Sequence, residues 1–151
     1  MIKIIETGKI PKEYQTLIDD FIKKTGPYEK VQIVSLKEIK LKKDESNLSE
    51  KLRDETQKAI EVASGRIIFL DANGKNPDSE EFKNEILKSK NIGETISFVI
   101  GGSYGFDHDM IKSYEKISFG RMTLLHHMTT LILTEAIYRS FKMAQNSNYN
   151  K

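Results

Sequence analysis

The chain contains no cysteine, which excludes disulfides, thiolate nucleophiles and zinc sites built from cysteine. It has no apolar run of the ~18 residues that a membrane-spanning helix needs, so we expect no association with a membrane. Residues 1–6 read as a strand and lack the apolar segment and cleavage site of a signal peptide. The chain also shows no internal repeat and no low-complexity linker. These absences predict a cytoplasmic protein.

Charge of either sign is nearly balanced, with 24 basic and 22 acidic side chains and a net charge of +2. This balance is compatible with nucleic acid but does not point to it, because dedicated binders are usually more basic. The 38% hydrophobic content is that of a folded protein, and we expect residues 1–151 to form one domain. One loop is crowded with lysines, which a solvated surface explains more readily than an RNA contact: Lys37, Lys40, Lys42 and Lys43.

Strand and helix signals alternate along the chain. We expect strands at 2–6, 31–36, 66–71, 95–100 and 116–119, and helices from Pro11 to 25, 46–64, 79–92, 108–114 and 126–141. Residues 72–77 read as a turn. This order predicts an α/β protein with a mostly parallel sheet and helices on both faces. The runs 67–70 and 96–100 are almost wholly apolar and belong in the centre of the sheet.

A cluster of glycines follows the strand at 95–100, at Gly101, Gly102 and Gly105. Glycine has no Cβ, so a ligand could approach bare backbone at the carboxyl end of this strand, where open α/β sheets bind small molecules. The same glycines could instead serve only as turn formers. Neither a dinucleotide-binding fingerprint nor a P-loop is present, because the glycine order and the lysine that these motifs need are missing.

The last helix is apolar around most of its circumference. Its apolar side chains are Met128, Leu131, Ile132, Leu133, Ala136, Ile137, Tyr138 and Phe141. A helix of this kind must be buried on more than one side. Burial in the core and burial in a subunit interface both explain the pattern, and the sequence leaves the two open.

His126 and His127 are adjacent, so on a helix they should point about 100° apart and should not chelate one metal ion. We therefore expect no metal site, one histidine packed and the other facing a site. His108 lies in a segment that reads as a surface helix with Asp107 as its N-cap.

Glu135 and Arg139 have the spacing of an ion pair within a helix, which competes with a catalytic role for either. No Ser-His-Asp or paired-carboxylate arrangement is legible. Hydrolase chemistry therefore has no support from the sequence.

Four segments in the last third of the chain carry a more specific signal: 98–105, 118–123, His126 and 131–142. In this order they resemble the RlmH family, SPOUT-class methyltransferases that modify a pseudouridine in large-subunit ribosomal RNA. The resemblance implies a C-terminal deep trefoil knot, an exception to the usual absence of knots, and a homodimer packed through the last helix. It also implies S-adenosylmethionine as cofactor, held by Leu70, Gly101, Phe119, Gly120, Arg121, Met122, Thr123 and Leu124.

The same resemblance places four residues near the RNA pocket: His126, Arg139, Tyr149 and Lys151. We expect His126 and Tyr149 to position the base, and Arg139 and Lys151 to stabilise charge or contact phosphate. The implied reaction is methylation of the N3 nitrogen of a pseudouridine in ribosomal RNA.

The chain departs from the family pattern at Leu125, where proline is usual, and at His127, Thr130 and Asn150. Asn150 replaces a tail histidine and Thr130 replaces a common arginine. Two other functions stay open: a SPOUT methyltransferase acting on another RNA such as tRNA, and a non-catalytic α/β ligand-binding module.

Overall fold

The computed structural model describes residues 1–145. In this range the strands are β1 (Ile2–Thr7), β2 (Val31–Leu36), β3 (Arg66–Lys75), β4 (Ile96–Ile100) and β5 (Glu115–Ile117). The helices are α1 (Lys12–Thr25), α2 (Leu48–Val62), α3 (Ser79–Asn91) and α4 (His126–Ala144). The strands of the described part form one five-stranded sheet in the order β2-β1-β4-β3-β5, and all neighbouring pairs are parallel. The predicted parallel α/β sheet is confirmed.

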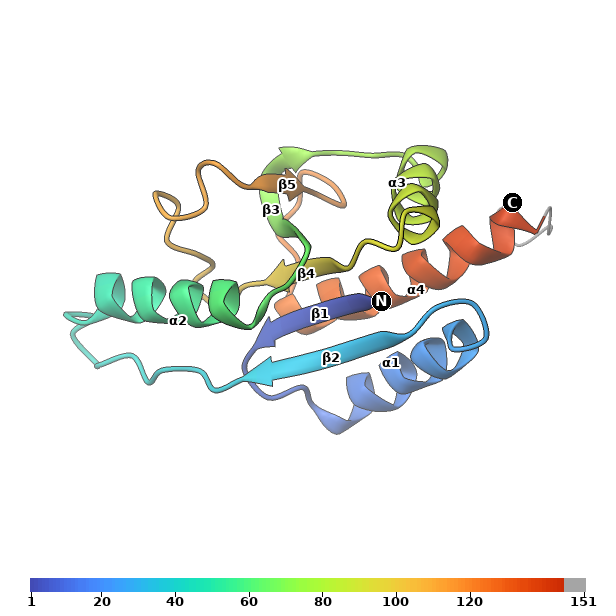
Figure 1. Cartoon of the computed structure of the whole chain (residues 1–151). Coiled ribbons are helices and arrows are strands. Elements are labelled where there is room, and N and C mark those ends of the chain that lie inside the picture. Colours follow the sequence, from blue (N-terminus) through green and yellow to red (C-terminus); the bar gives the residue numbers. More distant parts are fainter. Residues whose placement is uncertain (146–151) are drawn as a thin grey trace.

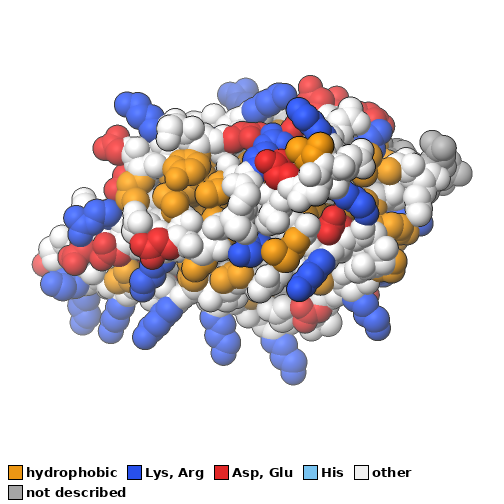
Figure 2. Space-filling view, viewed as in Figure 1, with side chains coloured by type: hydrophobic (Ala, Val, Ile, Leu, Met, Phe, Trp, Pro, Cys, Tyr) orange, Lys and Arg blue, Asp and Glu red, His pale blue; other side chains and the backbone are white. Residues whose placement is uncertain are grey.

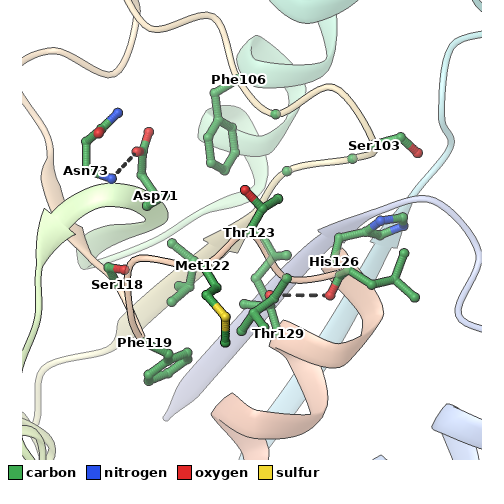
Figure 3. Close-up of a pocket in the computed structure, with 18 of the residues that line it drawn as sticks. Asp71, Asn73, Ser103, Phe106, Ser118, Phe119, Met122, Thr123, His126 and Thr129 are labelled. Carbon is green, nitrogen blue, oxygen red and sulfur yellow. Dashed lines mark hydrogen bonds between the residues drawn. The ribbon is translucent and has the colours of Figure 1, made fainter.

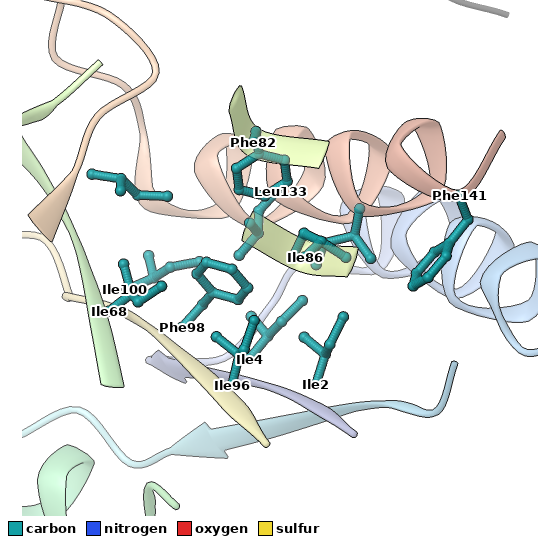
Figure 4. Packing of buried hydrophobic residues seen from close by; sticks show 12 residues of the cluster. Ile2, Ile4, Ile68, Phe82, Ile86, Ile96, Phe98, Ile100, Leu133 and Phe141 are labelled. Carbon is teal, nitrogen blue, oxygen red and sulfur yellow. The ribbon is translucent and has the colours of Figure 1, made fainter. Parts of the chain in front are cut away.

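Helices cover both faces of this sheet (Figure 1). Because side chains alternate along a strand, Ile4 and Phe98 point to one face while Ile5 and Val99 point to the other. The first face packs against α3 and α4, as Figure 4 shows for Phe82, Ile86, Leu133 and Phe141, and α1 lies beside α4. The second face packs against α2 and the connection between β4 and β5. The central strand β4 is buried along its whole length, as its apolar sequence predicts.

Local signals fix several element ends. Asp78 caps α3 in a capping box with Glu81: each side chain bonds the other residue's backbone N–H, at 2.8 and 2.9 Å. Between α2 and β3 the chain turns at Gly65, whose φ of +67° favours glycine. A Cβ there would lie 2.0 Å from the carbonyl oxygen of Thr95, so the close approach of these two segments also needs glycine.

Two predicted elements are wrong. The composition of residues 72–75 predicts a turn, but β3 runs on to Lys75, and its pairing with β5 shifts register between Leu70 and Lys75. The segment 108–114 forms turns and not a helix. The Asp107 carboxylate accepts the N–H groups of Asp109 and Met110, as a cap would, but the chain then turns so that Ile111 enters the core.

The last helix lies on the sheet between α1 and α3, which buries Leu133, Ile137 and Phe141. Core burial therefore accounts for its inner side. At the start of the helix Leu125 and Met128 stay 55% and 36% exposed. None of the helices described here is long and apolar enough to span a membrane.

Candidate functional site

The carboxyl ends of β3, β4 and β5 meet around a pocket of about 710 Å³ (Figure 3). The strands contribute Leu70, Ile100 and Ile117 to its wall. Two loops complete it, at 101–106 after β4 and at 118–125 after β5. The pocket thus occupies the edge of the parallel sheet at which open α/β proteins generally bind their ligands.

The residues predicted to hold the cofactor converge on this pocket. Its lining includes Leu70, Gly101, Phe119, Gly120, Met122, Thr123 and Leu124. Arg121 is exposed and is not part of the lining. Among the predicted RNA-pocket residues, His126 lines the same pocket.

The glycine loop after β4 folds back on itself. The Gly105 N–H donates to the Gly102 carbonyl at 3.0 Å, and Gly105 has a φ of +79°. A Cβ on Gly101 would lie 3.0 Å from the carbonyl carbon and oxygen of Gly105, a contact so tight that the Gly105 backbone would have to shift. The glycines are therefore turn formers and also leave backbone bare on the pocket wall, so the two readings are compatible.

The loop after β5 is held by its own serine. Ser118 Oγ donates to the Gly120 carbonyl at 2.5 Å and accepts the Gly120 N–H at 3.1 Å. Phe119 packs on Phe82 of α3, with ring centroids 6.2 Å apart. Met122 is 79% exposed and stands in the middle of the pocket region in Figure 3. A backbone loop held by its own hydrogen bonds and carrying an exposed thioether suits a ligand that has both apolar and hydrogen-bonding parts.

The side of the pocket opposite His126 carries Asp71 and Asn73 (Figure 3). The Asp71 carboxylate accepts the Asn73 N–H at 2.8 Å and lies 3.4 Å from Nδ1 of His108. The helix predicted around His108 is wrong, because this residue lies on a turn that lines the pocket, whereas its predicted surface position is confirmed. The carboxylate can accept further hydrogen bonds from hydroxyl or amino groups of a ligand.

His126 and His127 open α4 and have different environments, as predicted. His126 lines the pocket, whereas His127 Nδ1 lies 2.5 Å from Oε1 of the buried Glu6. Thr130 Oγ1 donates to Oε2 of the same carboxylate at 2.6 Å. His126 rests on His127 with ring centroids 3.8 Å apart. We call Glu6, His127 and Thr130 the buried triad.

Burial shifts the pKa values of both Glu6 and His126. It raises the pKa of the Glu6 carboxyl above its ordinary value, although hydrogen bonds from Thr130 and His127 oppose the change. Burial also lowers the pKa of His126, and the neighbouring His127 adds to the lowering, while Glu38 opposes it. His126 is therefore held toward its neutral form, in which one ring nitrogen can accept a proton.

The helical spacing predicts that the two histidine side chains point about 100° apart, but their rings lie against each other. Ligand atoms of Glu6, His126 and His127 are all within 4.8 Å of one another. However, both oxygens of Glu6 and Nδ1 of His127 already have hydrogen-bond partners. Glu6, His127 and Thr130 therefore form the hydrogen-bonded network around the carboxylate, and within residues 1–145 the His126 ring nitrogens have no hydrogen-bond partner.

Within residues 1–145, the predicted site residue Arg139 is not brought to this pocket. Arg139 pairs with Glu135 one turn earlier, with Nη2 2.7 Å from Oε1, which is the ion pair that the spacing predicted. Arg139 lies 13 positions after His126 on α4, about 20 Å along the helix axis. Tyr149 and Lys151 lie outside the described residues.

With this geometry established, comparison with known proteins identifies the family. A family model described as "Predicted SPOUT methyltransferase" matches residues 1–150. The chain belongs to the SPOUT methyltransferase family.

Its resemblance to the RlmH proteins is also confirmed. The ribosomal RNA large subunit methyltransferase H of Mycoplasmopsis pulmonis is 35% identical over 99% of both chains. The protein of the same name from Flavobacterium psychrophilum is 38% identical over 99% of this chain and 98% of its own.

Solved structures agree on the fold of this SPOUT methyltransferase. A probable methylase family protein from Haemophilus influenzae superposes with a TM-score of 0.59 at 13% identity, over 99% of this chain and 70% of that one. A putative methylase family protein from Neisseria gonorrhoeae gives a TM-score of 0.53 at 14% identity, over 91% and 81%. At these identities the likeness concerns the fold alone.

The sequence patterns do not point to several residues of the pocket and its surroundings. Asp71 and Asn73 follow the run 67–70, and their position at a strand end is a signal that could have found them. Glu6 gives no signal, because its partner His127 is 121 residues away in the sequence. Its burial follows from tertiary packing and not from any local pattern.

Proposed function

We propose that this SPOUT methyltransferase transfers a methyl group from S-adenosylmethionine to the N3 nitrogen of a pseudouridine in large-subunit ribosomal RNA. The observation that carries the proposal is the convergence of two backbone-rich loops and His126 on one pocket at the carboxyl edge of the sheet. The relatives named for methylation of large-subunit ribosomal RNA support the choice of substrate. In this proposal residues 1–151 act as one domain, in the cytoplasm where ribosomes are found.

The pocket residues fit S-adenosylmethionine. The volume of about 710 Å³ lies in the range of roughly 300–1,000 Å³ that is usual for small-molecule sites. Leu70, Phe119 and Leu124 offer apolar contacts, and the bare backbone at Gly101 offers peptide groups to a polar edge. Asp71 would accept hydrogen bonds from hydroxyl or amino groups. When bound, the cofactor supplies an electrophilic methyl group attached to a sulfonium.

The protein's main task is then to align the target nitrogen and to manage its proton. The N3–H of a pseudouridine is a weak acid, and N3 must lose this proton as it gains the methyl carbon. His126 stands on the pocket wall in an environment that favours its neutral form. We assign it the role of hydrogen-bonding N3–H and accepting the proton, directly or through water. The buried triad beneath it fixes the His127 ring on which His126 rests.

The proposal includes a homodimer packed through α4. Its support is the exposed apolar start of that helix, where Leu125 and Met128 are exposed and Leu131 is half-buried. Arg139 does not reach the pocket of its own chain. In the dimer, Arg139 or the chain end with Tyr149 and Lys151 would instead reach the pocket of the partner. The proposal further includes the trefoil knot, in which the 118–125 loop and α4 would complete the cup around the cofactor.

RNA from a deletion strain tests this function. Nucleoside mass spectrometry should show one methylated pseudouridine lost from large-subunit ribosomal RNA, restored by the wild-type gene and not by His126→Asn. Loss of a methyl group from tRNA instead would show that the protein is a SPOUT methyltransferase that acts on tRNA. Unchanged RNA, together with no heat on calorimetric titration with millimolar S-adenosylmethionine, would leave only a non-catalytic ligand-binding module.

A further inference from the structure

A second hollow, of about 720 Å³, opens beside the connection from β1 to α1. The end of β1, the first turns of α1 and the end of β2 form its walls. We call it the lysine groove; its lining is Gly8, Lys9, Ile10, Lys12, Gln15, Thr16, Asp19, Ser35, Leu36 and Lys37. The pocket described above includes none of these residues.

The charge of the lysine groove is positive and uncompensated. Lys9, Lys12 and Lys37 are exposed, and within residues 1–145 their ammonium groups form no ion pair and no hydrogen bond. Asp19 is the single acidic residue of the lining, and its Oδ1 accepts a hydrogen bond from Gln15 at 2.7 Å. The nearby Glu38 is engaged with the buried Lys51, whose Nζ lies 3.2 Å from its Oε1. Three cationic groups therefore remain free for an anionic partner.

The surroundings extend this positive surface. The lysine-rich loop that contains Lys40, Lys42 and Lys43 continues directly from Lys37. Figure 2 shows Lys and Arg side chains standing in a row along the lower edge of the molecule, on the side of α1, β2 and the connection to α2. A row of exposed cationic side chains suits an extended polyanion better than a compact ligand.

The lysine groove borders the proposed active site. Gly8 lines the groove, and a Cβ placed on Gly8 would lie 3.5 Å from Nε2 of His126. Gly8 has a φ of +105°, so a larger residue would be strained here as well as crowded. A nucleotide whose base reaches His126 can therefore extend its neighbouring phosphates toward Gly8 and Lys9.

From this juxtaposition we propose that the lysine groove binds the phosphodiester backbone of the RNA strand that flanks the methylated nucleotide. The inference rests on the proposed function and adds to it the path of the RNA across the protein. Phosphate contacts of this kind fix position and not sequence, so the groove would hold the strand while the pocket selects the base. A base that enters a pocket must be splayed out of a single-stranded or loop region, whose backbone such a groove can follow.

The test compares two triple variants of equal charge. The groove variant carries Lys9→Gln, Lys12→Gln and Lys37→Gln. Its control replaces three exposed lysines from other parts of the surface by glutamine: Lys58, Lys88 and Lys112. Methyl transfer to ribosomes from the deletion strain is measured across a range of salt concentrations, together with S-adenosylmethionine affinity.

We expect the groove variant to raise KM about tenfold or more, with kcat and cofactor affinity within about twofold of wild type. The slope of log(1/KM) against log[salt] should become shallower by about 2, since each single-strand phosphate contact contributes about 0.7. The control should keep the wild-type slope and KM. Equal slopes and equal KM for the two variants would overturn the inference. An inactive wild type, in contrast, would sink the proposed function itself.

A cross-link separates RNA from an acidic protein surface as the occupant. Because the chain has no cysteine, Lys12→Cys provides a single attachment point for a photoactivatable maleimide reagent. Irradiation on ribosomes should join this position to ribosomal RNA near the methylated nucleotide. A cross-link to ribosomal protein without any to RNA would contradict the assignment.

Discussion

Replacing Glu6 by alanine removes the carboxylate at the centre of the buried triad. Both of its oxygens are engaged, at 2.5 Å to Nδ1 of His127 and 2.6 Å to the hydroxyl of Thr130. The side chain is fully buried, so water cannot replace it at either partner without a cavity. The variant tests whether this network holds the start of α4 in place.

The expected cost follows from what each partner loses. Thr130 can fall back on the carbonyl oxygen of His126, which its hydroxyl already approaches at 3.2 Å, whereas Nδ1 of His127 is left without its partner. Removing one partner of a buried ion pair typically costs about 3–5 kcal/mol, and leaving a neutral buried polar group without its partner costs about 1–3 kcal/mol. Because Thr130 keeps an acceptor and the desolvated carboxylate disappears, we expect the low end of the first range for Glu6→Ala, about 3 kcal/mol of unfolding free energy. The isosteric Glu6→Gln should stay within about 1 kcal/mol of wild type, since it keeps the shape and one acceptor.

Urea unfolding of the wild type and both variants at 25 °C measures these differences. The pH dependence provides a second reading, because burial raises the pKa of Glu6 in the folded state. A raised pKa means that the contribution of Glu6 is fully present below its unfolded pKa, about 4.5, and is lost as pH rises through the folded value. Relative to Glu6→Gln, the wild type should therefore lose stability from about pH 4 upward. A Glu6→Ala protein within about 0.5 kcal/mol of wild type would refute the reasoning, since that is the range of ordinary surface changes.

Three further predictions concern the fold, the dimer and the site. Gly65→Ala should destabilise the protein several times more than Gly93→Ala in urea unfolding. Both glycines have a positive φ, which costs an alanine about 1–2 kcal/mol, but only the Cβ at position 65 would clash, 2.0 Å from the carbonyl oxygen of Thr95. Met128→Glu should convert the dimer to monomer in light scattering while Lys58→Glu does not, and a wild-type monomer at micromolar concentration would contradict the dimer. The stability that neutral His126 contributes should be present above its unfolded pKa of about 6.5 and lost as pH falls through its lowered folded pKa. His126→Asn should lack this loss, and parallel stability curves for the two proteins would oppose the assigned environment.

Local patterns are sufficient to predict most of the elements. The continuous apolar run at 96–100 predicts a central strand, and the alternation of strands with helices predicts the parallel sheet. The pocket loops, however, are located by resemblance to a family and not by their chemistry. A glycine cluster after a strand is compatible with many turns, and only the fold shows that 118–125 lies against it.

The errors arise where distant contacts override local preference. Residues 72–75 have the composition of a turn, yet they continue β3, and Lys75 pairs with Ile117 of β5, more than 40 residues later in the chain. The segment 108–114 begins like a capped helix, but the packing of Ile111 and Tyr114 beside Phe69 holds it in turns. Glu6 could not be found for the same reason, since a carboxylate inside a strand is understandable only beside His127.

In the proposed function, the pocket at the carboxyl edge of β3, β4 and β5 delivers a methyl group to RNA. The most direct measurement of this function is transfer of labelled methyl from S-adenosylmethionine by the purified protein to ribosomes from the deletion strain, followed by mapping of the label. We expect label on one pseudouridine of the large-subunit RNA, and none when Gly101→Ala crowds the pocket wall against Gly105. No label in any RNA with the wild-type protein, or full labelling by Gly101→Ala, would contradict it.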